Sequence, residues 1–314
     1  MTVRNVAVVQ AFPKPRDLPG SLAIALSRIR EAAAGGAQVI AFGESWLAGY
    51  PAWLDHCPGM GMWDNPATKE VFAELRASSV VVPGPQTHAL GALCKSLGVV
   101  VTIGVNERVD EGPGNGTLFN TLLTFDATGE LVTHHRKLVP TYTERLVWGP
   151  GDAHGLRPAA TKHARVGGLI CWEHWMPLAR QALHIHGEQI HVAVWPTAVE
   201  RHQLASRHYA FEARCFVLVG ASLLAAEDLP PQLERRPGLE DPKELILMGG
   251  SAIIGPDGTY IVEPVYDQEA ILTAEIDLRA IDREKMTLDV AGHYSRPDLL
   301  ELRVNPGPAR KLDI

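Results

Sequence analysis

The feature that most constrains the fold is the alternation of strand-like and helix-like segments over the first forty residues. Residues 3–10 form a nearly continuous apolar run typical of a buried strand, and residues 22–33 carry apolar side chains at helical spacing. Gly35 and Gly36 end that helix, and a second apolar run follows at residues 37–42. A strand, a helix and a second strand in this order favour a layered α/β fold with helices packed on a sheet.

The same alternation continues along the rest of the chain. Residues 119–125 and 131–134 flank a turn-forming segment and predict a β-hairpin, and residues 255–258 predict a tight turn. The other predicted strands are 99–105, 166–170, 190–195, 215–222, 246–254, 260–265 and 271–276, the last two as a meandering pair, and the other predicted helices are 178–186, 204–214 and 278–287.

Residues 227–244 interrupt this pattern. The segment holds four prolines, six acidic and three basic residues, with little apolar periodicity. It is too short to link two domains, so we interpret it as a surface insertion. We therefore expect residues 1–314 to form a single domain, with a short C-terminal tail from about residue 299.

The composition and net charge of the chain exclude some classes of binding partner. The chain is 46% hydrophobic and carries 29 basic against 36 acidic residues, a net charge of −7 without a basic block. Such a surface argues against nucleic acid or an anionic membrane as partner. No apolar run reaches the roughly 18 residues that a membrane span needs, and the first residues lead into a strand without a signal-peptide pattern. We expect a cytoplasmic protein.

The four cysteines, Cys57, Cys94, Cys171 and Cys215, are far apart and form no CxxC pair. Free thiols are therefore expected. Cys171 directly follows the predicted strand 166–170 and precedes what resembles the start of a helix, whose dipole would lower the pKa of the thiol and favour a nucleophilic thiolate. The alternative is that Cys171 is a small buried apolar residue, as most free cysteines are.

Two charged residues occupy similar positions at the ends of strands. Glu44 follows the predicted strand 37–42, where a half-buried carboxylate with a raised pKa can act as a base. Lys137 follows the second strand of the hairpin. Taken singly, Glu44 is more simply a helix cap and Lys137 a solvated surface charge. Together with Cys171 they predict one site at an edge of the sheet, where α/β proteins place their chemistry.

Thirteen histidines raise the question of a metal site, above all His184, His186 and His191. His184 and His186 fall on a predicted helix at a spacing of two, so their side chains point apart, and no HExxH motif occurs. We therefore expect neither a metal nor a cofactor.

The three strand-end segments together resemble the nitrilase superfamily of carbon–nitrogen hydrolases, whose signature is a Glu–Lys–Cys triad in this chain order. The resemblance is carried by Glu44, by residues 137–149 (KLVPTYTERLVWG), by Cys171-Trp172-Glu173 and by residues 293–298 (HYSRPD). It extends from about Val6 to about Asn305. The Trp172-Glu173 pair after the cysteine resembles the true nitrilase branch, whereas the amidase and carbamoylase branches more usually carry Tyr and Asp there.

The resemblance implies hydrolysis of an organic nitrile to the carboxylic acid and ammonia through a covalent cysteine thioimidate and thioester. Cys171 would be the nucleophile, Glu44 the base and Lys137 the group that stabilises developing charge. It also implies a role for Glu144 in orienting the lysine or the water; an ion pair with Arg145 or another arginine is the alternative. The protonation state of the resting thiol stays open, because two carboxylates and one lysine give the site a charge near −1.

The resemblance further implies an α-β-β-α sandwich, in which two mixed sheets face each other with helices outside, and a homodimer or higher oligomer. Tyr142, Trp172 and Trp195 are close in sequence to the triad segments, and we interpret them as substrate-binding pocket walls, although large aromatic residues more often belong to the core. The role of His202 stays open.

Other functions remain as alternatives. One is an amidase or carbamoylase of the same superfamily, and another is a histidine-based metallohydrolase. A third is a binding protein that carries the triad without catalysis. Within the nitrilase branch the substrate could be an aliphatic, arylaliphatic or aromatic nitrile, or hydrogen cyanide.

Overall fold

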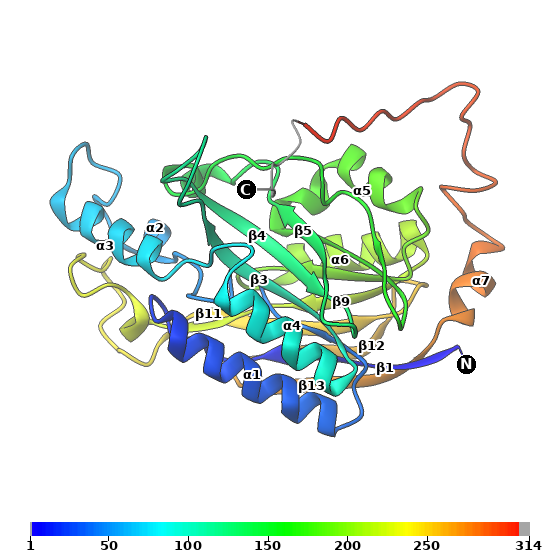
Figure 1. Cartoon of the computed structure of the whole chain (residues 1–314), viewed down its shortest axis with the longest axis horizontal. Helices are drawn as coiled ribbons and strands as arrows, with labels where there is room; N and C mark the ends of the chain where they lie inside the picture. The colour runs from blue at the N-terminus through cyan, green and yellow to red at the C-terminus, as the bar shows by residue number, and fades with distance from the viewer. Residues whose placement is uncertain (1, 308–314) are drawn as a thin grey trace.

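The computed structural model describes residues 2–307 and contains two mixed β-sheets packed face to face (Figure 1). The first sheet has the order β13–β1–β2–β3–β4–β5 and the second β10–β11–β9–β8–β7–β6, with β12 paired to β11. The strands are β1 (Val3–Gln10), β2 (Val39–Ala41), β3 (Val100–Arg108), β4 (Leu118–Phe125), β5 (Leu131–Arg136), β6 (Ala159–Ala160), β7 (Arg165–Ile170), β8 (Ile190–Val194), β9 (Phe216–Gly220), β10 (Leu223–Ala225), β11 (Leu245–Ile254), β12 (Tyr260–Tyr266) and β13 (Ala270–Asp277).

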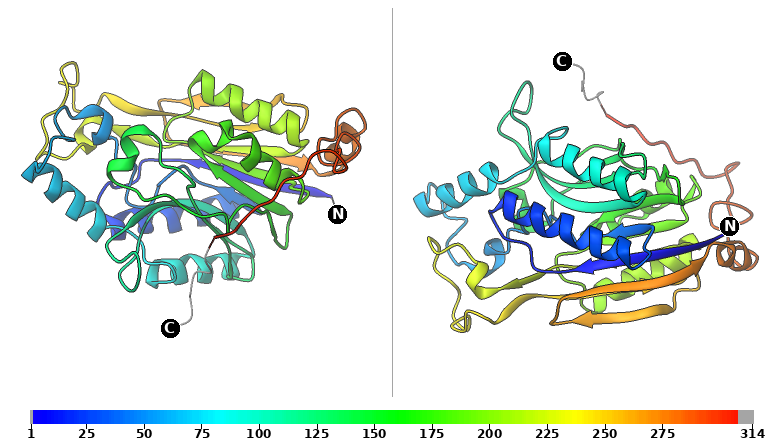
Figure 2. Two further views of the ribbon diagram at one scale, coloured as in Figure 1. Left: turned by 90° about the horizontal axis from the view of Figure 1, so that it is seen from above. Right: turned by 60° about the horizontal axis from the view of Figure 1, so that its bottom comes forward.

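Helices cover the outer face of each sheet, which confirms the predicted α-β-β-α sandwich (Figure 2, left). Helices α1 (Leu18–Ala34) and α4 (Pro85–Leu97) pack on the first sheet, and α5 (Pro177–His184) and α6 (Glu200–Ala213) pack on the second. The other helices are α2 (Trp53–His56), α3 (Pro66–Ala77) and α7 (Arg279–Lys285), with 3-10 turns η1 (Tyr142–Leu146), η2 (Cys171–Trp175) and η3 (Ala226–Asp228). Within the described residues no helix is both long enough and apolar enough to cross a membrane.

The layers follow from the apolar patterns of the sequence. Ala25 and Ile29 of α1 are fully buried against Ile40 and Val101 of the first sheet. Helix α1 begins four residues earlier than the apolar spacing predicts, because the Asp17 carboxylate accepts a hydrogen bond from the Gly20 N–H at 2.9 Å and caps the helix.

The last two strands are paired differently from the prediction. The turn at residues 255–258 connects β11 to β12 as an antiparallel hairpin, as expected. However, β12 and β13 do not form a meandering pair, since β12 pairs with β11 in the second sheet and β13 pairs with β1 in the first. A local apolar pattern predicts that a strand exists. Which strand it pairs with depends on which edge of a sheet still has unpaired backbone groups.

Residues 227–244 lie between β10 and β11, and they contribute to a third apolar cluster. Leu229, Leu233 and Leu239 are buried there with Trp53 and Trp148. The segment is thus irregular, as its composition predicts, but its leucines close one end of the sandwich. At the C-terminal side, the chain after α7 runs back along the upper edge in Figure 1, where Leu302 packs against the main core.

Three strands bring the predicted site together at one edge. Strands β2 and β3 are parallel, and β5 runs in the same direction because it is antiparallel to β4, which is antiparallel to β3. Glu44 and Lys137 therefore follow strands that end at the same edge of the first sheet. Cys171 follows β7 of the facing sheet, and β7 packs against β4.

Candidate active site

Glu44 lies fully buried beyond the end of β2. Its Oε1 accepts hydrogen bonds from Asn120 Nδ2 at 2.7 Å and from Lys137 Nζ at 3.1 Å. The next residue, Ser45, has a left-handed backbone with φ of 46°, so the chain turns sharply here. This turn crosses β3 at Gly104, where a Cβ would lie 2.4 Å from Ser45 N and 2.5 Å from Gly43 O. The close approach of the two backbones requires glycine at this position.

Lys137 follows β5 and its side chain is only 1% exposed. The alternative that Lys137 is a solvated surface charge is therefore wrong. Its ammonium group donates to Glu44 Oε1 at 3.1 Å and to Glu144 Oε2 at 2.7 Å. Burial alone would lower the pKa of Lys137, but the negative charges of the Glu44 and Glu144 carboxylates raise it. The site therefore holds a permanent cation between two carboxylates.

Glu144 is the buried residue of η1, and three donors hold its carboxylate. Oε2 accepts from Lys137 and from the Thr141 N–H at 2.6 Å, and Oε1 accepts from the Tyr50 hydroxyl at 2.9 Å. The alternative of an ion pair with Arg145 or another arginine is wrong for the described residues, because Glu144 is paired with Lys137, while Arg145 Nε donates to the Pro140 carbonyl at 3.1 Å.

Cys171 begins η2 immediately after β7 with φ of 52°, a strained left-handed conformation for a residue with a side chain. Its Sγ and one carboxylate oxygen each from Glu44 and Glu144 all lie within 4.8 Å of one another. The nucleophile, base and cation predicted from separate segments thus meet in one buried cluster.

The predicted effect of a helix on Cys171 is wrong. The residues after it form a 3-10 turn of five residues, and α5 begins only at Pro177. Burial raises the pKa of the Cys171 thiol well above its usual value, and the charge of Glu44 adds to this more than Lys137 offsets. The resting nucleophile is therefore a neutral thiol.

An acceptor for the thiol proton is present at Glu44. Its Oε2 is buried and has no hydrogen-bond partner among the described residues, whereas Oε1 is occupied. Burial raises the pKa of Glu44 to about 7, and Lys137 and Asn120 limit that rise. A carboxylate with this pKa is matched to accepting and returning protons near neutral pH.

Glu173 is a site residue whose role the sequence analysis missed. Its carboxylate accepts from the Ile170 N–H at 2.7 Å, from the Leu138 N–H at 2.8 Å and from His135 Nε2 at 3.0 Å. It therefore joins the backbone beside Cys171 to the backbone beside Lys137. The signal was present in the sequence, since Glu173 is two residues from the cysteine, but its partners lie on another strand.

Two further residues that support the carboxylates were also missed. Asn120 on β4 donates to Glu44, and its own Oδ1 accepts from the Ser45 hydroxyl at 3.2 Å. Tyr50 holds Glu144. Neither is distinctive in the sequence, because their partners are 76 and 94 residues away.

The three aromatic residues predicted to line the pocket differ in exposure. Tyr142 is 80% and Trp172 50% exposed, both beside site residues in sequence. Trp195 is fully buried; its ring stacks on His174, and its Nε1 donates to Ser206 Oγ at 3.2 Å. The structure thus gives Trp195 a buried packing position, and its role as a pocket wall stays a prediction. His202 lies beside Trp195, and its Nδ1 accepts from the Val199 N–H at 3.1 Å.

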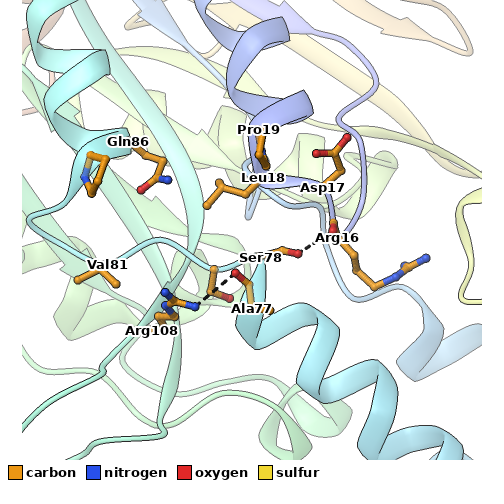
Figure 3. A pocket seen from close by; sticks show the side chains of 11 residues that line it. Arg16, Asp17, Leu18, Pro19, Ala77, Ser78, Val81, Gln86 and Arg108 are labelled. Carbon is orange, nitrogen blue, oxygen red and sulfur yellow. Dashed lines mark hydrogen bonds between the residues drawn. The ribbon is translucent and has the colours of Figure 1, made fainter.

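Several cavities among the described residues lie outside the triad. One of about 510 Å³ is formed by the segment before α1, the end of α3 and the start of α4 (Figure 3). Its two arginines, Arg16 and Arg108, are paired with Glu74 and Asp110. An apolar cavity of about 380 Å³ is lined by Trp53, Phe72 and Leu146, and it borders the η1 segment that carries Glu144.

The oxygen and sulfur atoms of the site could in principle bind a metal ion. The oxygens of Glu44 and Glu144 with Cys171 Sγ have a spacing that suits a cation. Both carboxylates already contact the Lys137 ammonium group, which supplies the positive charge. His184 is buried against Glu212 and His186 is exposed, so these two side chains point apart as predicted.

Comparisons with known proteins agree with this geometry. Residues 5–285 match the carbon-nitrogen hydrolase family profile. The chain is 39% identical to an aliphatic nitrilase of Sinorhizobium fredii, covering 98% of this chain and 97% of that protein. It is 37% identical to a nitrilase of Paraburkholderia phymatum, covering 98% and 88% of the two chains. Its fold resembles a carbon-nitrogen hydrolase of Helicobacter pylori with a TM-score of 0.68, at 18% identity and covering 96% and 99% of the two chains.

Proposed function

The chain belongs to the carbon–nitrogen hydrolase family, and we propose that it is a nitrilase, which converts an organic nitrile and two water molecules into a carboxylic acid and ammonia. The observation that carries this proposal is the single buried cluster in which Cys171 Sγ lies beside the oxygens of Glu44 and Glu144, with Lys137 bound to both carboxylates. The nitrilases among its relatives match it over nearly the whole chain. We further propose that the chain forms one catalytic domain.

In the first step, Glu44 Oε2 accepts the proton of Cys171 as Sγ bonds to the nitrile carbon. The π electron pair moves to the nitrogen, where the Lys137 ammonium group stabilises the developing negative charge. The nitrogen then takes the proton from Glu44, which leaves a thioimidate on Cys171 and a regenerated carboxylate. Glu144 holds Lys137 in place through the 2.7 Å contact.

Glu44 serves as the base for both water molecules in the hydrolysis. It takes a proton from the first water molecule as this adds to the thioimidate carbon, and it passes the proton to the nitrogen, which gives a tetrahedral intermediate with a hydroxyl and an amino group. The proton of the new hydroxyl group then passes through Glu44 to the nitrogen, the carbon–nitrogen bond breaks, and ammonia leaves as the carbon–oxygen double bond of the thioester forms. The resulting thioester is attacked by a second water molecule, again deprotonated by Glu44. The carbon–sulfur bond breaks, the sulfur regains its proton and the carboxylic acid is released.

The test of this function is ammonia release by the purified protein from a panel of aliphatic, arylaliphatic and aromatic nitriles and cyanide. Cys171→Ala should abolish release, whereas the matched variant Cys94→Ala, at a buried thiol on α4, should retain it. Persistent ammonia release by Cys171→Ala would refute the mechanism. The panel also identifies the substrate class.

The rival functions have distinct outcomes. An amidase or carbamoylase would turn over amides in preference to nitriles, so the acid-to-amide product ratio and amide turnover separate it from a nitrilase. A metallohydrolase would lose activity with EDTA. A non-catalytic binding protein would release no ammonia from any member of the panel.

We also propose a homodimer or higher oligomer formed through α5 and α6. These helices expose Leu178 at 70% and Leu204 at 64%, together with Phe211 and with Ile185 just after α5. Exposed apolar side chains grouped on one face are typical of an interface. Light scattering during gel filtration should give at least twice the 34.1 kDa chain mass, and a Leu178→Lys/Leu204→Lys double variant should reduce it. A cytoplasmic location agrees with four free cysteines and is tested by cell fractionation.

A further inference from the structure

A line of buried polar side chains leads away from the backbone of Cys171 into the second layer of helices. His174 Nδ1 lies 2.7 Å from the Cys171 carbonyl oxygen, and His174 Nε2 lies 3.0 Å from His191 Nε2. His191 Nδ1 lies 2.8 Å from Glu188 Oε1, and the Tyr209 hydroxyl donates to Glu188 Oε2 at 2.6 Å. All of these side chains are buried, and the reaction described above uses none of them.

The Cys171 carbonyl oxygen, at the start of this line, determines the position of each hydrogen along it. A carbonyl oxygen only accepts, so His174 Nδ1 must carry the hydrogen. In a neutral His174 the Nε2 atom is then an acceptor, and His191 Nε2 must donate to it. His191 Nδ1 and Glu188 Oε1 therefore share one proton, carried either as a neutral acid and a neutral imidazole or as a carboxylate and an imidazolium.

We propose that His174, His191 and Glu188 form a positioning relay, in which this one shared proton keeps His174 donating to the Cys171 carbonyl and so holds the nucleophile in its left-handed conformation. The proposal rests on Cys171 being the nucleophile of the proposed reaction. Cys171 at φ of 52° is costly unless its surroundings fix it, and its carbonyl is the backbone group next to the strained angle.

Loss of the shared proton has a definite geometric consequence. A Glu188 carboxylate beside a neutral His191 draws the hydrogen to Nδ1, which makes His191 Nε2 an acceptor. His174 must then donate through Nε2, so that its Nδ1 lone pair faces the Cys171 carbonyl oxygen at 2.7 Å. The hydrogen bond that holds Cys171 is thereby replaced by a repulsive contact.

The environment of the relay favours the neutral acid and neutral imidazole below about pH 7. Burial raises the pKa of Glu188 to about 7 and lowers the pKa of both His191 and His174. The charged and titratable groups around the pair, from β7–η2, α5, α6 and the start of β9, are Glu173, Arg180, His184, Tyr209, Glu212 and Cys215. The relay should therefore lose its proton as pH rises through about 7.

Two substitutions at His174 separate its hydrogen bond to the Cys171 carbonyl from its contact with His191. The Asn side-chain nitrogen occupies the place of Nδ1, so His174→Asn retains the donor to Cys171 and disconnects His191. His174→Gln places its nitrogen near Nε2 and loses that donor. We expect kcat on the best nitrile to fall about ten- to a hundredfold in His174→Gln, with KM little changed, and His174→Asn to recover most of this loss. Equal losses in the two variants would overturn the proposal.

Glu188→Gln tests the shared proton. Its amide can donate to His191 Nδ1 and accept from Tyr209 without titrating. The decline of kcat above about pH 7 that the wild type should show through the relay should therefore be absent in Glu188→Gln. A matched control is His163→Gln, at a partly buried histidine whose ring contacts the Gly98 carbonyl and no member of the relay, and it should keep the wild-type pH profile. An alkaline limb unchanged in Glu188→Gln would refute the assignment.

A readout independent of turnover distinguishes failure of this proposal from failure of the proposed function. A carboxyl group whose pKa is raised by folding contributes stability below its ordinary pKa and loses it as pH rises through the folded value. The wild type should therefore lose stability relative to Glu188→Gln between pH 4.5 and 7, by about 300-fold in the unfolding equilibrium constant. A melting-temperature difference that does not widen over this range would overturn the shared proton, whether or not nitriles are hydrolysed.

Discussion

Replacement of Glu173 should both destabilise the protein and disable the site. The carboxylate accepts two backbone N–H groups, at Ile170 and Leu138, and pairs with buried His135. Removing this carboxylate leaves three buried donors without an acceptor, which costs about 4 kcal/mol in all at about 1–3 kcal/mol for each unsatisfied donor. With an unfolding entropy of about 2.1 cal/mol/K per residue over 314 residues, a loss of about 4 kcal/mol lowers the melting temperature of Glu173→Ala by about 6 °C.

Catalysis should fall in the same variant, because the two backbone segments that position Cys171 and Lys137 lose their common acceptor. We expect kcat to fall at least about tenfold, which corresponds to about 1.4 kcal/mol in the barrier. Glu173→Gln keeps a carbonyl acceptor and should lose about half as much stability. The assays are thermal unfolding at one fixed scan rate and initial rates of ammonia release at saturating nitrile.

A control variant and the pH dependence of stability test the role of Glu173 further. Glu301→Gln removes an exposed carboxylate paired with Arg303 and should leave both readouts unchanged. His135 and backbone N–H groups lower the pKa of Glu173 despite its burial, so its contribution is present above the ordinary value and is lost as pH falls through the folded value. The stability gap between wild type and Glu173→Gln should narrow in acid. A shift below about 1 °C in Glu173→Ala with normal kcat would refute the reasoning.

Three further predictions concern groups around the triad. Asn120→Asp places a second carboxylate at the 2.7 Å contact with Glu44 and should raise the pKa of Glu44 above about 7. Because Glu44 must be ionised to accept a proton, the acid limb of the kcat/KM profile should move to higher pH. An acid limb that does not move would contradict this prediction. Tyr50→Phe removes one donor to Glu144 and should lower kcat about fivefold, measured beside a melting temperature within about 2 °C of wild type. Gly104→Ala brings a Cβ to 2.4 Å from the Ser45 nitrogen and should abolish soluble expression, whereas normal yield would show that the turn can move.

Much of the fold was predictable because it rests on local patterns. The buried strand at Val3–Gln10 and the hairpin of β4 and β5 are visible as apolar runs bounded by turn residues. The chemistry-bearing residues were predictable for the same reason, since Glu44, Lys137 and Cys171 each come shortly after the end of such a run. Their meeting at one edge follows from the directions of three strands.

The remaining features depend on contacts between distant parts of the chain. The pairing of β13 with β1 joins the two ends of the sequence, and no periodicity within β13 specifies it. Asn120 and Tyr50 have no motif of their own and are functional through Glu44 and Glu144. The packing of Trp195 on His174 was not predictable either, because closeness in sequence to the site does not determine which face of the sheet a side chain occupies.

The charges of the site determine when the nucleophile becomes reactive. Two buried carboxylates share one ammonium group, so ionising Cys171 would add a second uncompensated negative charge, and its pKa is raised accordingly. Proton transfer to Glu44 is then uphill in the resting site. It becomes favourable when sulfur bonds to an electrophilic carbon, because negative charge moves from sulfur to a nitrogen that Lys137 can stabilise. The same burial that suppresses the free thiolate thus couples its formation to the arrival of substrate.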